Sequence, residues 1–109
     1  MALEKIGKMS LKNAGGFVAR IQYRYVDERG ERHLSEASKD ITLGVTKTLS
    51  PDEFGVPCDA LIAMHVLVVL GVDNEATQEF IFDPKSPLCA HYIISGTTLS
   101  NDLGLIDVS

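Results

Sequence analysis

The stretch from Phe17 to Val26 alternates between two kinds of side chain, and this pattern constrains the fold more than any other feature of the chain. One set is aromatic or aliphatic and the other is mostly polar. The first set is Phe17, Ala19, Ile21, Tyr23 and Tyr25, and the second is Val18, Arg20, Gln22, Arg24 and Val26. A period of two places successive side chains on opposite faces of a β-strand. We therefore expect a half-buried strand over residues 17–26 with its aromatic face in the core.

Turn residues separate this strand from several others. The polar segment 27–31 contains Gly30, which predicts a hairpin with residues 32–34 as the returning arm. Residues 41–49 alternate again and predict another strand, in which Lys47 breaks the pattern. Residues 61–72 are apolar on both faces, as in a central strand that is covered on both sides. The other predicted strands cover residues 77–82, 88–95 and 103–108.

One short helical turn is predicted near residues 50–55. Ser50 is a favoured cap, Pro51 suits the first helical position, and two acidic residues follow in the first turn. Gly55 and Pro57 end the helix almost at once. This turn is expected to link the two sheets.

About seven strands at this spacing, with turn residues between them, are typical of an all-β, immunoglobulin-like antiparallel β-sandwich. A small β-barrel is the alternative. A length of 109 residues allows one domain. We expect residues 14–109 to form this sandwich and residues 1–13 to form a flexible or loosely attached N-terminal arm, because Gly7 and Ser10 weaken any helix there.

The net charge of −5 is unevenly distributed along the chain. Residues 1–48 carry a net charge of +3 and residues 49–109 carry −8. Such a dipole favours head-to-tail association into a homo-oligomer, or binding of an anionic partner through the basic side. The acidic balance, and the lack of a basic stripe interleaved with aromatic residues, argue against nucleic acid as a partner.

The first residues do not resemble a signal peptide, since they contain no long apolar run. The most apolar stretch, residues 60–70, is too short to form a transmembrane helix. A cytoplasmic location is therefore the default expectation, with release by a non-classical route as an alternative.

Three segments carry a resemblance to known sequences: residues 12–21 (KNAGGFVARI), 40–48 (DITLGVTKT) and 94–101 (ISGTTLSN). They resemble a group of β-sandwich proteins of about a hundred residues from fungi and bacteria, and by fold-level analogy small sandwiches of such organisms are often lectins, cytotoxins or membrane-acting defence proteins. The resemblance implies a binding role and assigns no residue.

No catalytic constellation is visible, and we predict that the chain is not an enzyme, with no cofactor and no metal. Cys89 and His91 share one strand face, but buried cysteine packing is the favoured interpretation. A Cys58–Cys89 disulfide is not favoured in a reducing compartment. The spacing of the three histidines, His33, His65 and His91, resembles no zinc motif. The turn 73–75 offers oxygen side chains to Ca²⁺, although it lacks the spacing of an EF-hand.

Two surface features are candidate binding sites. Arg20, Gln22 and Arg24 lie along the outer face of the first long strand, where two guanidinium groups could grip a carboxylate, a phosphate or a sulfated glycan. A solvated or ion-paired sheet face is the alternative. The second candidate is a set of three lysines within the N-terminal arm, where they could contact a membrane or a protein partner: Lys5, Lys8 and Lys12.

These observations favour a non-catalytic recognition module, with a glycan, an anionic surface or a protein as its partner. A defence-type lectin, a cytotoxin and a membrane-active protein are the specific forms considered. The alternative is a self-associating protein whose function is its assembly, since exposed sheet edges and the charge asymmetry favour association.

Overall fold

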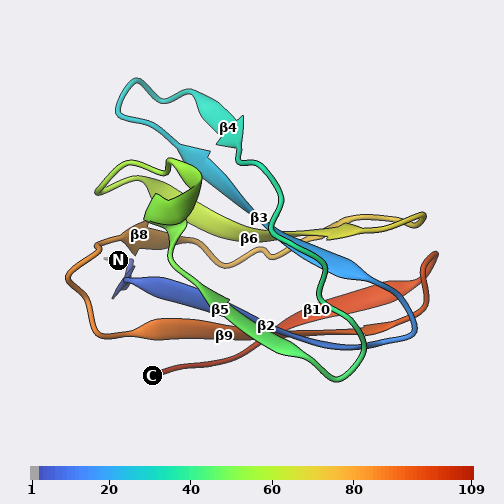
Figure 1. Cartoon of the computed structure of the whole chain (residues 1–109). Coiled ribbons are helices and arrows are strands. Elements are labelled where there is room, and N and C mark those ends of the chain that lie inside the picture. The colour runs from blue at the N-terminus through green and yellow to red at the C-terminus, as the bar shows by residue number, and fades with distance from the viewer. Residues whose placement is uncertain (1–2) are drawn as a thin grey trace.

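The structure is a computed structural model that describes residues 3–109 as two β-sheets packed face to face (Figure 1). The predicted all-β sandwich with a single short helical turn is confirmed. The elements are β1 (Lys5–Ile6), β2 (Lys8–Gly15), β3 (Ala19–Val26), β4 (Arg32–Leu34), β5 (Thr46–Leu49), the 3-10 helix η1 (Pro51–Phe54), β6 (Leu61–Val68), β7 (Asn74–Glu75), β8 (Phe80–Phe82), β9 (Cys89–Gly96) and β10 (Asn101–Val108).

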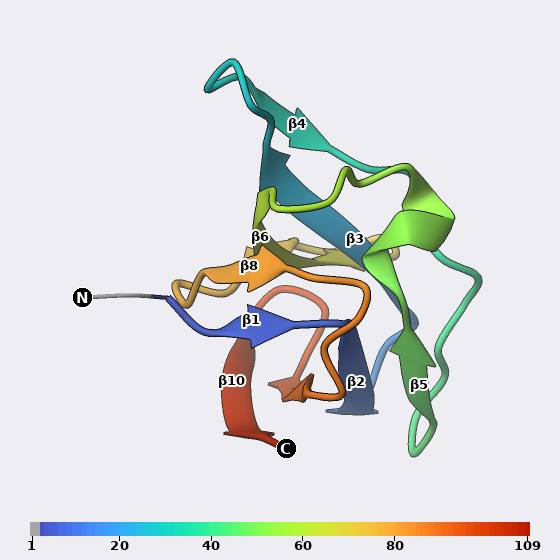
Figure 2. The same ribbon diagram turned by 90° about the vertical axis from the view of Figure 1, so that its left-hand side faces the viewer.

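The six-stranded sheet has the order β1-β8-β6-β3-β4, with β7 joined to β6, and the four-stranded sheet has the order β10-β9-β2-β5. The two sheets form the upper and lower layers of Figure 1, and Figure 2 shows β1 beside β8 at the edge of the upper layer. The long antiparallel pair β3–β6 places Ile21 opposite Val66 and Tyr23 opposite Met64. These four inward side chains are fully buried, so the predicted aromatic face of β3 does face the core.

The N-terminal segment is part of the sandwich, so the expectation of a loosely attached arm over residues 1–13 is wrong for the described residues 3–13. Ile6, Met9 and Leu11 have no exposed surface. The chain passes from the six-stranded sheet to the four-stranded sheet at Gly7, where a Cβ atom would collide with the carbonyl oxygen of Ser86. Residues 1–2 lie outside the described part of the chain.

The pairing of this segment also corrects the expectation of purely antiparallel sheets. β1 runs parallel to β8, and β2 runs parallel to β9 from Lys8 opposite Cys89 to Gly15 opposite Gly96. The other strand pairs are antiparallel, as expected. Pairing between the start and the end of the chain closes the sandwich.

Four predicted strands are shorter than expected, and the one expected over residues 17–26 loses only its first two residues. The strand expected over residues 61–72 ends at Val68, and the one expected over 77–82 is reduced to Phe80–Phe82. Of the stretch 41–49, only Thr46–Leu49 is a strand, because Ile41 bridges to Ala19 in the other sheet before Gly44, at φ +85°, turns the chain. The chain therefore crosses between layers where the sequence pattern alone indicated a continuous strand.

The helical turn begins as predicted. The carboxylate of Glu53 accepts a hydrogen bond from the Ser50 amide at 3.1 Å, and Gly55 ends the turn in the left-handed region at φ +80°. Phe54 then packs on Tyr23 with ring centroids 5.4 Å apart. The turn thus covers the side of the core between the two sheets. Within residues 3–109, no helix combines the length and the apolar character needed to cross a membrane.

Candidate functional site

Two loops meet at one end of the sandwich, opposite the end that carries the C-terminus (Figure 1). The first loop, residues 69–73, joins β6 to β7, and the second, residues 97–100, joins β9 to β10. They follow strands of different sheets, so they extend the two layers past the core. We call these two loops together the apolar tip.

The first loop forms because β6 cannot continue past Val68. The Val69 amide bonds to the carbonyl oxygen of Val18 at 3.0 Å, and the Gly71 amide bonds back to Val68 at 3.1 Å, which turns the chain. Leu70, in the middle of this turn, adopts a left-handed conformation with φ +59°. Such a conformation costs a residue with a Cβ atom about 1–2 kcal/mol. The geometry of the turn therefore does not explain why a leucine occupies this position.

The second loop is tied to the first by the main chain. The Val72 amide donates to the carbonyl oxygen of Thr98 at 2.8 Å. Gly71 lies so close to Thr98 that a Cβ atom at residue 71 would collide with that oxygen. Beneath this contact Asn74 donates to the Asn101 side chain at 2.7 Å, and Asn101 donates to the carbonyl oxygen of Val72 at 2.8 Å. The two loops therefore form one braced unit.

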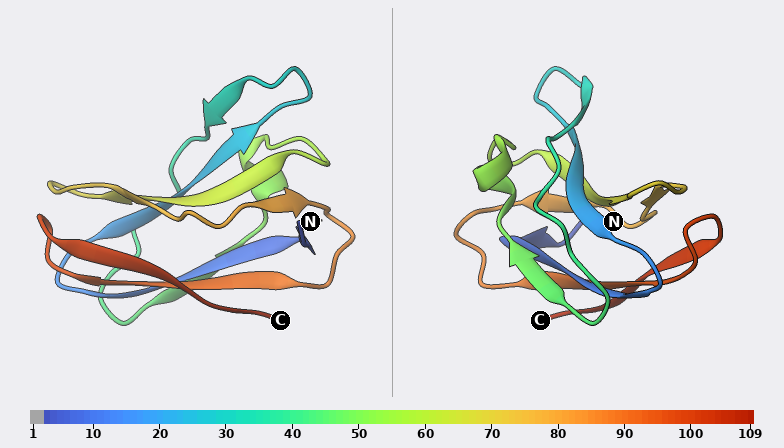
Figure 3. Two further views of the ribbon diagram at one scale, coloured as in Figure 1. Left: turned by 180° about the vertical axis from the view of Figure 1, so that it is seen from behind. Right: turned by 45° about the vertical axis from the view of Figure 1, so that its right-hand side comes forward.

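The tip carries the two most exposed large apolar side chains of the described residues, together with Val72. Leu70 is 96% exposed, Leu99 is 75% exposed and Val72 is 52% exposed. Both views in Figure 3 place the two loops together at one end of the molecule. Single exposed apolar residues are common on protein surfaces, but a cluster on a braced, strained loop needs a reason. Neither loop contains a lysine or an arginine.

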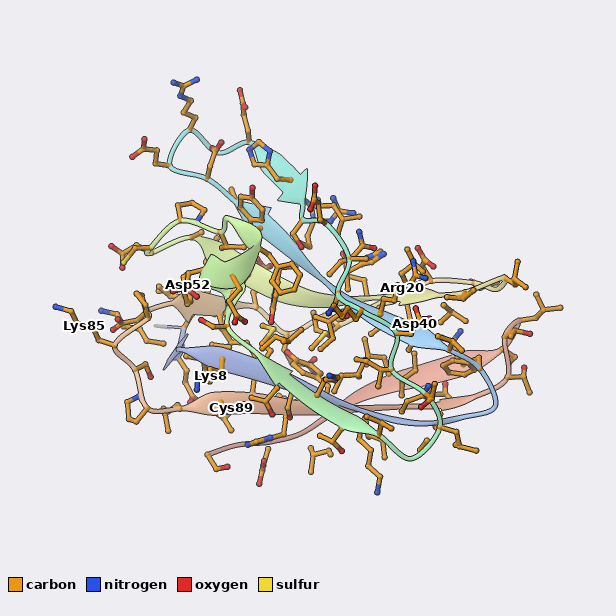
Figure 4. The ribbon with its side chains drawn as sticks, viewed as in Figure 1. Lys8, Arg20, Asp40, Asp52, Lys85 and Cys89 are labelled. Atoms are coloured by element: carbon orange, nitrogen blue, oxygen red, sulfur yellow. The ribbon has the colours of Figure 1, made fainter. Side chains whose placement is uncertain are left out.

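The predicted anion-binding residues on β3 are occupied by partners within the chain. The Nε atom of Arg20 lies 2.6 Å from Oδ1 of Asp40, and the two side chains lie together in Figure 4. The Nε atom of Arg24 lies 3.1 Å from Oε1 of Glu75, and Gln22 donates to the carbonyl oxygen of Ser35 at 2.8 Å. An external anion would have to compete with these groups. The arrangement agrees with the alternative of an ion-paired sheet face.

The three N-terminal lysines are exposed but do not form one face. Lys5 lies on β1 in the six-stranded sheet, while Lys8 and Lys12 lie on β2 in the four-stranded sheet. Figure 4 shows Lys8 beside Cys89, its register partner on β9. None of the three belongs to the apolar tip.

The two cysteines are free: Cys58 is exposed and Cys89 is buried. The Sγ atom of Cys89 lies 3.8 Å from Nδ1 of His91, but Ser10 lies closer to the same nitrogen, at 2.7 Å. Burial raises the pKa of the Cys89 thiol above its usual range, although the Ser10 hydroxyl and Lys8 act against this. The geometry therefore keeps this thiol protonated and does not make a thiolate–imidazole pair.

The three histidines lie on three different strands, β4, β6 and β9. Among the described residues, one group of three possible metal ligands has its ligand atoms within 4.8 Å of one another: Asp27, Glu31 and His33. Asp27 already binds Nε2 of His33 at 2.8 Å and accepts the amides of Arg29 and Glu31. This internal pairing accounts for the cluster. In the turn 73–75, all three side chains already have partners within the protein: Asp73 contacts the Val68 amide and His65, Asn74 contacts Asn101, and Glu75 contacts His65.

The apolar tip differs from what the sequence pattern predicts. Leu70 and Val72 were assigned to a buried strand because they continue an apolar run, whereas the structure exposes both. The glycine between them was the signal that the strand had already ended. Leu99 stands alone among small polar residues, where its exposure could have been expected.

No family model and no curated protein matches the chain in sequence. Solved structures with the same fold do match. Listeriolysin O matches with a TM-score of 0.53 and 20% identity, covering 94% of this chain and 22% of that one. Pneumolysin matches with a TM-score of 0.51 and 17% identity, and the human-specific toxin intermedilysin with 0.50 and 19%; both cover 94% of this chain and 23% of theirs.

The chain therefore has a fold found in these three proteins and spans about a quarter of their length. At these identities the likeness shows the fold alone. It does not test the resemblance to small fungal and bacterial proteins, which stays a prediction.

Proposed function

We propose that the chain is a non-catalytic module that binds the surface of uncharged lipid bilayers through the apolar tip. The observation that carries this proposal is the exposure of Leu70 and Leu99 on two loops braced against each other. Leu70 is held outward in a backbone conformation that disfavours leucine. A side chain kept at such cost, with no packing inside the protein, suits a function outside it.

The free energy gained by burying these side chains is of the size expected for reversible binding to a bilayer surface. Full burial of one leucine or valine side chain is worth about 1.5–3 kcal/mol. Three such side chains, inserted to the depth of the headgroup region, give an attachment that is weaker than that of a transmembrane helix. Because the bracing hydrogen bonds fix the loops beforehand, little conformational entropy is lost on binding.

The charges near the tip favour an uncharged surface over an anionic one. Asp73 ends the first loop and Asp102 follows the second, while the loops contain no basic residue. An anionic bilayer would repel these carboxylates. Attachment through Lys5, Lys8 or Lys12 would have the opposite lipid preference, so lipid composition separates the two modes.

The likeness to pneumolysin, listeriolysin O and the human-specific toxin intermedilysin supports a membrane-directed function. Since the chain spans about a quarter of each neighbour, we propose docking and do not extend the proposal to the whole activity of those proteins. One pneumolysin structure, with a TM-score of 0.51 and 16% identity, is described as that of a sugar-binding protein. Glycan binding is therefore the competing outcome to test.

The test is flotation of the full chain with three vesicle preparations: phosphatidylcholine, phosphatidylcholine with phosphatidylserine, and total lipid from red cells. We expect binding to the first and third and weaker binding to the second. The double variant Leu70→Ser with Leu99→Ser should lose at least about tenfold in affinity, as expected for two buried apolar side chains. Ile106→Ser is the matched control, because Ile106 is 59% exposed but lies on β10 away from the tip.

Two results would reject the proposal. One is binding that requires phosphatidylserine and survives the double variant. The other is agglutination of red cells that free sugars abolish, with no binding to any vesicle, which would indicate a glycan ligand. Sedimentation over a range of salt concentrations, run in parallel, tests the alternative of a self-associating protein.

A further inference from the structure

His65, on the outer face of β6, lies between two carboxylates. Its Nδ1 atom is 3.0 Å from Oε1 of Glu75 on β7, and its Nε2 atom is 3.3 Å from Oδ2 of Asp73 in the first tip loop. Its side chain is 12% exposed, so both ring nitrogens face these oxygens more than they face water. The ring thus bridges the loop and the strand that follows it.

The two contacts cannot both be hydrogen bonds when the imidazole is neutral, because a neutral ring has one N–H group. The shorter contact, to Glu75, is the better position for that hydrogen. The lone pair of Nε2 then faces the oxygen of Asp73, which is repulsive. A protonated ring donates to both carboxylates and holds them together.

Asp73 connects the protonation state of His65 to the apolar tip. Its other oxygen, Oδ1, accepts a hydrogen bond from the Val68 amide at 3.0 Å. The Asp73 side chain therefore closes the loop that presents Leu70 and Val72. When His65 draws Asp73 toward β6, the loop is held at both of its ends.

Among the groups around His65, it is the protonation state of His65 itself that decides this arrangement. Gln22, its register partner on β3, is uncharged and bonds elsewhere. Arg24, also on β3, binds the same oxygen of Glu75 as His65 does, and Arg20 is paired with Asp40. Burial alone would raise the pKa of Glu75, but hydrogen bonds from His65 and Arg24 outweigh it and leave that pKa below its usual value. Glu75 thus stays ionised in weak acid.

We infer that His65 is a positioning residue whose protonation closes the first tip loop and strengthens binding of the tip to lipid. The inference rests on the proposed function for its lipid readout. Protonation also compensates the charge of Asp73, which would otherwise have to approach the bilayer unpaired. Both effects make binding tighter when the ring is protonated, so we compare binding at pH 5.5 and at pH 7.5.

The first readout needs no lipid. Amide hydrogen exchange of residues 69–73 is measured in the full chain at both pH values, and wild type is compared with His65→Gln at each pH so that intrinsic rates cancel. We expect greater protection of the wild type at pH 5.5 only. His33→Gln is the matched control, because His33 also pairs with a carboxylate but lies on β4.

The second readout is flotation with phosphatidylcholine vesicles, whose headgroup charge does not change between these pH values. Wild type should bind about fivefold more tightly at pH 5.5, which corresponds to about 1 kcal/mol. His65→Gln should lose this response and His33→Gln should keep it. Asp73→Asn should bind tightly already at pH 7.5, because its amide can donate to the neutral Nε2 atom while its oxygen keeps the Val68 amide.

The outcomes separate the two proposals. If wild type binds vesicles and His65→Gln shows the same pH response and the same exchange, the inference is wrong and the proposed function stands. If no vesicle is bound at either pH, the proposed function fails for this lipid, and the exchange data alone decide whether His65 closes the loop.

Discussion

The amide of Val72 donates to the carbonyl oxygen of Thr98 at 2.8 Å, and this hydrogen bond joins two loops that follow strands of different sheets. A sandwich is held together by its core, and its end loops are usually its most mobile parts. Here the loops share a main-chain contact beyond the last core layer. The tip therefore extends the sandwich beyond its core, and this contact ties the loop of Leu70 to the loop of Leu99.

Gly71 lies so close to Thr98 that one added methyl group should destabilise the protein. Gly71→Ala should lower the free energy of unfolding by about 1–3 kcal/mol, because the new Cβ atom meets the carbonyl oxygen of Thr98 and the loops must separate. The measurement is urea unfolding followed by circular dichroism. Gly104→Ala is the control, since a Cβ atom there has no neighbour within 4 Å. Equal stabilities of the two variants would mean that the loops are not in contact in solution.

We expect a substitution of Leu70 to change folding stability and lipid binding in opposite directions. Leu70→Asn should raise the free energy of unfolding by about 0.5–1 kcal/mol, because asparagine tolerates the left-handed region and the leucine makes little packing contact. The same variant should bind vesicles more weakly. If Leu70→Asn were instead destabilised by 2 kcal/mol or more, about the cost of losing a buried leucine, Leu70 would have to be packed inside the protein.

Most of the fold could be predicted from the sequence because strands of a sandwich have a local signature. The alternation over residues 17–26, and the apolar run that begins at residue 61, identified the central pair β3–β6. The N-terminal strands were missed because their partners are remote: β1 pairs with residues 81–82 and β2 with residues 89–96. The alternation of Met9 and Leu11 was nevertheless a strand signal in a segment that we expected to be a flexible or loosely attached arm.

The candidate site could not be predicted in the same way. Whether Leu70 is buried depends on where β6 ends, and that depends on the approach of Gly71 to Thr98, which is far along the chain. The pairing of Arg20 with Asp40 is also a contact between distant segments. Polar residues on a strand face look like a binding site in the sequence until their partners within the protein are known.

Asn13 is a buried polar residue whose three hydrogen bonds hold the turn after β2. Its Nδ2 atom donates to the carbonyl oxygens of Phe17 at 2.7 Å and Ile41 at 2.9 Å, and its Oδ1 atom accepts from the Gly15 amide. Asn13→Ala removes the side-chain partner of the Phe17 carbonyl and of the Gly15 amide, while the Ile41 carbonyl keeps its hydrogen bond from the Ala19 amide. The variant should cost about 2–4 kcal/mol of stability in urea unfolding. Asn13→Asp should cost still more at neutral pH, because a carboxylate would face two carbonyl oxygens. A loss below 1 kcal/mol for the alanine variant would contradict this role.

We expect Glu75 to contribute to the loss of folding stability in acid. Burial acts to raise its pKa, but the hydrogen bonds from His65 and Arg24 outweigh it, so the folded-state pKa lies below the usual value of about 4.5. The stabilisation is therefore complete above that value and is lost as the pH falls through the folded-state pKa. Because the side chain is 34% exposed, the gain is under about 1 kcal/mol.

Glu75→Gln tests this directly in urea unfolding at several pH values. The variant should be less stable than wild type at pH 7, and the difference should shrink steadily below about pH 4.5. A difference that is constant down to pH 2 would assign the effect to packing and not to the charge of Glu75.

Two buried tyrosines, one on each sheet, form a matched pair, because removal of their hydroxyl groups should affect folding stability differently. The Tyr23 hydroxyl donates to the carbonyl oxygen of Leu49 at 3.0 Å, whereas the Tyr92 hydroxyl is buried without a hydrogen-bond partner in the described chain. Burial raises the pKa of both phenols well above the usual value, so both keep their proton at neutral pH. Tyr23→Phe should lower the free energy of unfolding by about 0.5–1.5 kcal/mol.

Tyr92→Phe should leave stability unchanged or raise it by about 1 kcal/mol, because it removes a polar group that is desolvated with no compensating bond. Both variants keep the ring and its packing, so the comparison isolates the hydroxyl. Urea unfolding at pH 7 measures both. If Tyr92→Phe were as destabilising as Tyr23→Phe, the Tyr92 hydroxyl would have to bind a group such as an internal water molecule, and the core at β9 would be less dry than the packing of its neighbours indicates.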